Sequence, residues 1–151
     1  LEQIHELSLN LRPSMLDDLG IVSTVSWFCR EFENVYAGIH IEKRVTVNED
    51  NVPEPLKIVI FRILQESLNN VSKYAKADLV KISLFLEDGR LVLVIKDNGR
   101  GFDMEQLQST KSSQGGFGLT SMKERTDLSG GKLVVDTSPG DGVTIMASWT
   151  L

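Results

Sequence analysis

Residues 91–101 of this chain are Leu91-Val92-Leu93-Val94-Ile95-Lys96-Asp97-Asn98-Gly99-Arg100-Gly101, an apolar run that passes directly into a polar, glycine-containing segment. The apolar half is rich in β-branched residues, which is typical of a buried strand. A second strand-like run, 80–86, precedes it across the turn-forming residues 87–90. This arrangement predicts a β-hairpin that ends in a turn at Asp97.

The rest of the chain alternates between helical and strand-like patterns. Further strands are expected at 39–47, 132–137 and 143–150, helices at 1–10, 19–36, 56–74 and 119–128, and a long loop at 99–116. Two hairpins cannot belong to a purely parallel sheet, because parallel strands need crossover connections. The sequence therefore predicts an α+β fold, a two-layer α/β sandwich. Its sheet is mixed and mostly antiparallel, about three helices cover one face, and a short helical segment precedes it.

Composition narrows the classes of function. The 151 residues suit one domain with a substantial core. The formal net charge of −5 argues against direct nucleic-acid binding, which needs a basic surface. Cys29 is the single cysteine, so the chain cannot form an internal disulfide framework. No run approaches the roughly 20 apolar residues that span a bilayer. The chain begins with Leu1, which suggests a fragment of a longer protein.

Three polar side chains share one face of the helix expected at 56–74. Glu66, Asn70 and Lys73 occur at i, i+4 and i+7, roughly opposite the apolar stripe. An acid, an amide and an amine therefore converge there. The alternative is an ordinary solvated face with intrahelical pairing, which spacing alone favours.

Two glycine-containing segments are also candidates for chemistry. Asp97 stands at a strand end, where its carboxylate can accept a hydrogen bond from the amine of adenine, whereas guanine has a carbonyl at the equivalent position. The alternative is a plain Asx turn. Gly115-Gly116-Phe117-Gly118-Leu119 leads into a helix, whose N-terminus favours anions. A flexible loop is the alternative there.

Together these segments resemble the ATP-binding catalytic domain of sensor histidine kinases, which shares its fold with type II topoisomerases, mismatch-repair ATPases and a heat-shock chaperone. Residues 65–75 resemble the N box, 97–101 the first glycine box and 116–119 the second. The motifs 122–125 and 128–131 resemble the subclass paired with helix-turn-helix response regulators. So does Leu11-Arg12-Pro13 with residues 16–20. By this resemblance, residues 1–12 are the end of a dimerisation helix and its connector, and 13–151 are the catalytic domain.

The resemblance implies a role for each matched residue at the reacting end of ATP. Asn70 would coordinate the Mg²⁺ that bridges the phosphates, and one amide oxygen suffices because Mg²⁺ keeps several waters. Lys73 would contact phosphate. Glu66 would orient the attacking histidine or help to deprotonate it. Catalysis would consist mainly of positioning and charge neutralisation.

The resemblance also assigns the adenine end and the lid. Asp97 would accept from the adenine amine. Gly99 and Gly101 would let the chain turn against the nucleotide and start a mobile lid. Gly116 and Gly118, followed by Leu119, would form the far hinge of that lid.

Three positions depart from the family pattern. Tyr74 stands where the subclass has a histidine. The usual Gly-Thr pair before the last strand is Gly142-Val143 here, and a one-residue shift swaps strand faces, which argues against Thr144 as an adenine contact. His5 lies about one and a half turns before Leu11, too close to be the phosphoacceptor. The acceptor is therefore expected outside this chain.

The resemblance implies a catalytic domain that transfers the γ-phosphoryl group of ATP to a histidine on an upstream dimerisation domain, in a homodimeric two-component kinase. A cognate response regulator then receives the phosphoryl group. We expect a cytoplasmic domain, belonging in some architectures to a membrane-anchored sensor. The alternatives are an anti-sigma-type serine-protein kinase, against which the connector argues, and a degenerate nucleotide-binding or docking module.

Overall fold

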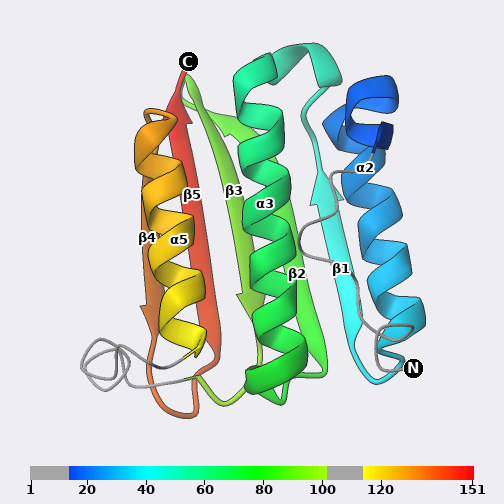
Figure 1. The fold of residues 1–151 in the computed structure, drawn as a ribbon, viewed down its shortest axis with the longest axis vertical. Helices are drawn as coiled ribbons and strands as arrows, with labels where there is room; N and C mark the ends of the chain where they lie inside the picture. The colour runs from blue at the N-terminus through cyan, green and yellow to red at the C-terminus, as the bar shows by residue number, and fades with distance from the viewer. Residues whose placement is uncertain (1–13, 102–113) are drawn as a thin grey trace.

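The computed structural model describes residues 14–101 and 114–151 as two layers, a sheet and helices on one of its faces (Figure 1). Its elements in chain order are helix α2 (Ser14–Val35), strand β1 (His40–Val45), the 3-10 turn η1 (Glu49–Asn51), helix α3 (Glu54–Asn70), the π-helical turn η2 (Val71–Ala75), strands β2 (Leu79–Glu87) and β3 (Arg90–Asp97), helix α5 (Gln114–Leu128), and strands β4 (Lys132–Thr137) and β5 (Val143–Thr150). The two-layer α+β architecture expected from the sequence is confirmed.

The sheet has five strands in the order β1-β2-β3-β5-β4. Strand β1 runs parallel to β2, and every other neighbouring pair is antiparallel. The expected β2–β3 hairpin is present and closes at Asp88-Gly89, whose φ angles of 52° and 76° suit a tight two-residue turn. The sheet is therefore mixed and mostly antiparallel, as predicted.

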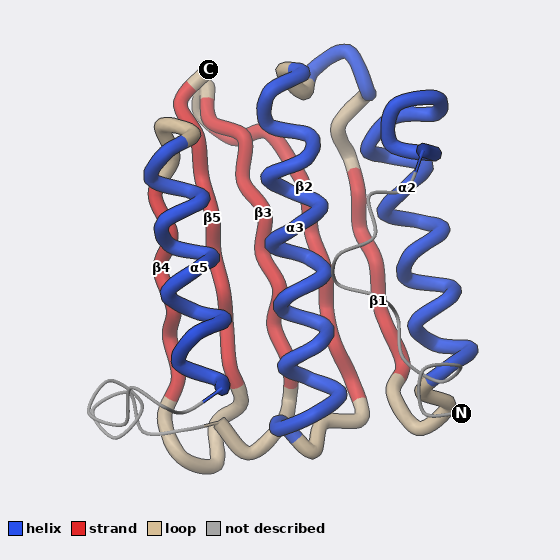
Figure 2. Tube along the Cα trace, in the orientation of Figure 1, coloured by secondary structure: helices blue, strands red, loops and turns tan. Residues whose placement is uncertain are grey.

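The core lies between the sheet and helix α3, which crosses the centre of the sheet (Figure 2). Alternate residues of the central strands point toward the helices: Val80, Ile82 and Leu84 from β2, and Leu91, Leu93 and Ile95 from β3. From α3 the buried aliphatic side chains include Ile60, Ile63, Leu64 and Leu68. Burial of each such side chain contributes roughly 1.5–3 kcal/mol, so this packing fixes α3 over β3.

Two helix boundaries differ from the sequence prediction. Helix α2 begins at Ser14 and contains a break at Gly20, where φ is 87°, so an additional helical turn precedes the predicted helix. Helix α5 begins at Gln114, which places Gly116 and Gly118 inside a helix, where a loop and its end were predicted. The predictions for His5, for the connector at 11–13, for the domain boundary at 12/13 and for the lid segment 102–113 concern parts that lie outside the described residues.

The ends of three elements meet at one edge of the molecule. Helix α3 and strand β3 both end at the lower edge in Figure 1, and α5 begins there. The opposite edge carries η1 and the beginnings of α2 and α3. Among the described helices, none is long and apolar enough to cross a membrane.

Candidate functional site

Asp97, the last residue of β3, is a buried carboxylate with only 6% of its surface exposed. The backbone N–H of Gly99 donates to Asp97 Oδ1 at 2.8 Å, and the backbone N–H of Val143 also donates to this carboxylate. Burial raises the pKa of Asp97, and the two backbone hydrogen bonds offset part of that rise. The structure thus holds an acceptor group, sheltered from water, at the end of a central strand.

The polar face predicted on α3 lies at the same edge of the molecule. Glu66 and Asn70 are half-buried, and Lys73 is exposed in the π-helical turn that follows Asn70. Short π-helical segments are rare and are found frequently at functional sites. Burial raises the pKa of Glu66, while the nearby positive charges of Lys73 and Arg125 lower it. Glu66 is therefore a carboxylate whose basicity the surrounding protein increases.

Helix α5 packs directly against Glu66 through Gly118. A Cβ at position 118 would overlap Glu66 Oε1 and would lie 3.3 Å from Asn70 Nδ2. A side chain at this position would therefore have to displace the Glu66 carboxylate. In the described conformation Gly118 therefore serves helix packing, and the predicted hinge role of Gly116 and Gly118 stays a prediction.

A cavity lies between α3, α5 and the ends of β3 and β5. Its walls are mostly apolar, with a few polar side chains among them, which is the usual make-up of a small-molecule site. Four of the predicted site residues line it, namely Asn70, Asp97, Gly101 and Leu119. Among the other predicted residues, Glu66 and Gly118 lie beside Asn70, and the backbone N–H of Gly99 donates a hydrogen bond to Asp97. Lys73 is not among the residues that line this cavity.

Sequence reasoning missed most of the apolar lining of this cavity. Val71, Tyr74 and Ala75 fall within the N box at 65–75, but no contact with a ligand was predicted for them. The remaining members are Ser67, Ile95, Val143 and Ile145. Alternation along β3 and β5 could have identified three of these four, because Ile95, Val143 and Ile145 share the helix-facing side of the sheet with Asp97.

The register of β5 settles the departure at positions 143 and 144. Val143 is buried, lies opposite Asp97 and lines the cavity. Thr144 lies opposite Lys96 and so points to the other face of the sheet. This register supports the argument against Thr144 as an adenine contact, which stays a prediction.

The oxygen donors at the end of α3 are suited to Mg²⁺ bound to phosphates. Among residues 14–101 and 114–151, no group of three or more His, Cys, Asp or Glu side chains is placed to hold a metal ion. The site does offer the amide oxygen of Asn70 and the carboxylate of Glu66 one helical turn earlier. Mg²⁺ bound to phosphates needs only one or two such oxygens, so these residues fit that ion.

Comparison with known sequences supports one family. The sequence profile of the family described as "Histidine kinase-, DNA gyrase B-, and HSP90-like ATPase" matches residues 56–151. The chain is 37% identical over 148 residues to the signal transduction histidine-protein kinase/phosphatase DegS of Brevibacillus brevis, covering 98% of this chain and 37% of that protein. It is 32% identical to the oxygen sensor histidine kinase NreB of Staphylococcus carnosus, covering 96% of this chain and 40% of NreB. The chain thus spans well under half of the length of these relatives.

Solved structures agree on the fold. A histidine kinase domain from the Erythrobacter litoralis EL346 blue-light activated histidine kinase superposes with a TM-score of 0.68 at 17% identity, covering 85% of this chain and 60% of that one. The mycobacterial sensor histidine kinase MprB gives a TM-score of 0.62 at 21% identity, covering 85% and 92%. The profile match includes α3 from Leu56 onward, the cavity and the whole sheet apart from β1. The chain belongs to the family of histidine kinase-, DNA gyrase B- and HSP90-like ATPases.

Proposed function

We propose that this chain is the ATP-binding catalytic domain of a two-component sensor histidine kinase, of the subclass paired with helix-turn-helix response regulators. The observation that carries the proposal is the convergence of Asp97, Asn70 and Leu119 on one cavity, with Glu66 beside it. The names of the relatives, which are sensor or signal-transduction histidine kinases, support the same activity.

The cavity is suited to the adenine base of ATP. Asp97 accepts a hydrogen bond from the exocyclic amine, and the apolar walls formed by Tyr74, Ile95 and Ile145 cover the flat ring. In the described conformation the cavity is narrow, with room for little more than one water molecule. The walls must therefore move apart when the base enters.

The phosphates lie toward the end of α3. The Asn70 amide oxygen would hold the Mg²⁺ that accompanies ATP, and Lys73 would contact phosphate from the exposed side. Bound Mg²⁺ supplies neutralisation of the charge on the transferred phosphoryl group. The protein's part is to hold these groups in place and to exclude water.

The reaction is transfer of the γ-phosphoryl group to a histidine of the upstream dimerisation domain. A ring nitrogen of that histidine forms a bond to the γ-phosphorus, the bond to the β,γ-bridging oxygen breaks, and ADP leaves. Glu66 accepts the proton from the other ring nitrogen, or holds it by a hydrogen bond. Its raised pKa makes it a better proton acceptor than an exposed glutamate.

The proposal is tested with the chain, γ-labelled ATP and a separately supplied dimerisation domain. We expect label on the acceptor that is lost in acid, because phosphohistidine is acid-labile. Glu66→Gln should lower the transfer rate roughly 100-fold while changing ATP affinity by less than about threefold. The control is Glu124→Gln, an exposed glutamate of α5. Acid-stable label would favour the anti-sigma-type serine kinase, and absence of label with intact ATP binding would favour a degenerate module.

The remaining partners follow from this activity. The full-length protein is a homodimer through the upstream domain, it passes the phosphoryl group to a cognate response regulator, and this domain works in the cytoplasm, where ATP is available. Co-purification of the full-length dimer and transfer of label from it to candidate response regulators test these assignments.

A further inference from the structure

Helix α2 is interrupted by a glycine close to its beginning. Gly20 has φ 87° and ψ 178°, so the residues before it, 14–19, form a separate helical turn and a new helix begins at Ile21. Only glycine adopts this φ without strain. The first N–H groups of the new helix have no partners within the helix and need an acceptor from elsewhere.

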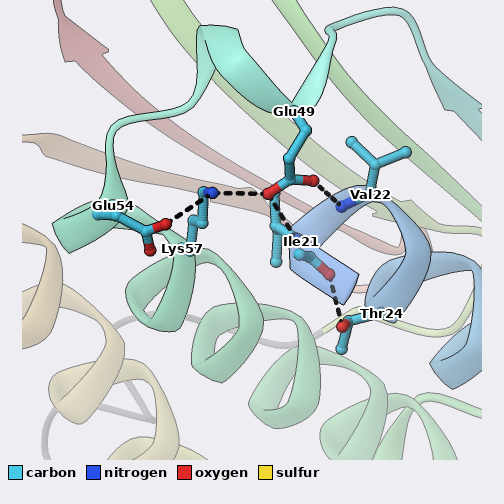
Figure 3. A network of polar contacts seen from close by, with 7 residues as sticks. Ile21, Val22, Thr24, Glu49, Glu54 and Lys57 are labelled. Carbon is cyan, nitrogen blue, oxygen red and sulfur yellow. Dashed lines mark hydrogen bonds and ion pairs between the residues drawn. The ribbon is translucent and has the colours of Figure 1, made fainter. Parts of the chain in front are cut away.

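Glu49 supplies that acceptor from a distant part of the chain. The N–H of Ile21 donates to Glu49 Oε2 at 2.9 Å, and the N–H of Val22 donates to Glu49 Oε1 at 3.0 Å (Figure 3). The residues are separated by 28 and 27 positions, and Glu49 belongs to the turn η1. One carboxylate therefore caps the restarted helix with both of its oxygens.

The same carboxylate is bound to helix α3. Lys57, near the beginning of α3, places its Nζ 2.8 Å from Glu49 Oε2 and 3.0 Å from Glu54 Oε1. The Lys57 side chain is only 12% exposed. Although burial raises the pKa of Glu49, its hydrogen bonds with Lys57, Val22 and Ile21 outweigh that effect and hold the pKa below its ordinary value. The joint formed by Gly20, Glu49 and Lys57 thus connects the start of the helix after Gly20 to α3 through a charged group.

The joint is tightly fitted as well as polar. A Cβ at Gly20 would overlap the Glu49 carboxylate, so the backbone at the break lies against the acid. The Thr24 hydroxyl donates to the Gly20 carbonyl at 2.6 Å and fixes the other side of the break. These contacts fix the backbone at the break relative to α3, and residues 14–19 precede it in the chain.

The direction of the backbone at the break has a consequence at the other end of α3, where Glu66 and Asn70 lie. Helix α3 has 17 residues and is about 25 Å long. A rotation of about 10° at the joint moves a point at that distance by about 4 Å, and misplacement by about 1 Å is enough to slow a reaction substantially. The residues before Gly20 lead toward the upstream domain that, in the proposed function, carries the acceptor histidine.

We propose that Glu49 is a positioning residue for phosphoryl transfer: by capping the helix after Gly20 and pairing with Lys57, it sets the direction in which the connector leaves the catalytic domain and so aligns the acceptor histidine with Glu66. This inference rests on the proposed function. It concerns delivery of the acceptor only, since Glu49 lies at the edge of the molecule opposite the nucleotide cavity.

The test compares Glu49→Gln with Glu54→Gln in two transfer formats. In Glu49→Gln the new side chain keeps one oxygen for two N–H groups and an ammonium, and its own NH₂ then faces donors. Glu54 also pairs with Lys57, but its side chain is 84% exposed and does not contact α2, so it is the matched control. In the first format the full-length chain phosphorylates its own acceptor. In the second format, residues 1–151 phosphorylate a separately supplied acceptor domain, for which the direction of the connector is irrelevant.

We expect Glu49→Gln to lower transfer in the full-length chain about tenfold and to leave ATP affinity and transfer to the separate domain within about twofold. Glu54→Gln should leave both unchanged. Equal losses in the two formats, or no loss in either, would overturn the positioning role. A wild-type protein that transfers in neither format would instead overturn the proposed function.

Amide hydrogen exchange on residues 1–151 tests the joint without any activity. The amides of Ile21 and Val22 should exchange at least about tenfold faster in Glu49→Gln, with those near Asn70 unchanged. Unchanged protection at Ile21 and Val22 would show that Glu49 does not hold the joint, whatever the transfer assays give.

Discussion

Replacement of Asp97 by asparagine separates the two properties of this side chain, its acceptor role toward adenine and its cost to folding. The asparagine keeps one oxygen, which can accept from the backbone N–H groups of Gly99 and Val143 that both donate to the carboxylate in the wild type. It loses the negative charge and the second acceptor oxygen. The proposed function therefore predicts a protein that folds normally and binds ATP poorly.

The size of the loss follows from the burial of the side chain. A hydrogen bond to a charged group contributes about 1.5–3 kcal/mol, which corresponds to a roughly 10- to 150-fold change in Kd. At 6% exposure, water screens the carboxylate little, so we expect the upper half of this range. The asparagine NH₂ can donate to the guanine carbonyl, so the preference for ATP over GTP should shrink at the same time.

The effect on folding has the opposite sign and depends on pH. Because the folded-state pKa of Asp97 is raised above the ordinary value of 3.8, the folded protein binds this proton more tightly than the unfolded chain does. The stability from that proton is fully present below the ordinary pKa and is lost as pH rises through the folded-state pKa. Asparagine does not ionise, so Asp97→Asn should gain free energy of unfolding relative to the wild type over that pH range.

Two binding assays measure the effect on nucleotide affinity: titration with a fluorescent ATP analogue and competition by GTP. Urea unfolding at about pH 4 to 8, where a carboxyl with a raised pKa titrates, measures the effect on stability. The matched control is Asp136→Asn, an exposed carboxylate on the edge strand β4. Unchanged ATP affinity in Asp97→Asn would refute the adenine contact. Equal losses of ATP and GTP affinity would refute the argument for base selection, and a loss of stability near neutral pH would refute the reasoning about burial.

Three further predictions concern Gly118, Gly20 and Glu49. Gly118→Ala should displace the Glu66 carboxylate and lower the rate of phosphoryl transfer at least about tenfold, with less than about 1 kcal/mol change in the free energy of unfolding. The control is Gly38→Ala, whose new methyl group would meet no atom within 4 Å and should leave transfer unchanged. Transfer assays and urea unfolding measure the two effects. Gly20→Ala should lower the free energy of unfolding by about 2 kcal/mol or more, because the alanine adds backbone strain and its methyl group pushes Glu49 away. An unchanged midpoint of urea unfolding would contradict this prediction. The third prediction concerns pH: because the pKa of Glu49 is lowered in the folded state, the carboxylate stabilises the protein above its ordinary pKa of 4.5. This contribution is lost as pH falls through the folded-state pKa. The difference in free energy of unfolding between wild type and Glu49→Gln, measured by urea unfolding, should therefore vanish in acid.

Local patterns in the sequence were sufficient to predict the β2–β3 hairpin and the buried face of helix α3. Alternation at 80–86 and 91–96 specified a hairpin, and the Asp-Gly pair at 88 and 89 supplied its turn. The apolar stripe of α3 specified its buried face, which left Glu66 and Asn70 on the side where the cavity lies. These features are determined by neighbours within a few residues, so a single sequence contains them.

The start of α5 could not be predicted in the same way. Residues 114–118 contain three glycines, which are poor helix formers, and composition alone therefore favoured a loop. In the structure, the missing side chain of Gly118 allows close packing on α3, and this tertiary contact outweighs the low propensity. Helix propensity is a weak term that packing overrides.

The sequence by itself determined that an acid follows an apolar strand and that an acid, an amide and an amine occur at helical spacing in 56–74. Only the tertiary structure decided which distant groups meet: Val143 beside Asp97, Gly118 over Glu66, and Glu49 on the amides of Ile21 and Val22. The physical reason is that periodicity reports which side of an element is buried, while the segment that covers it depends on the packing of the whole chain. An unpaired N–H at a helix start requires an acceptor, but nothing in the adjacent residues specifies that the acceptor comes from 28 positions away.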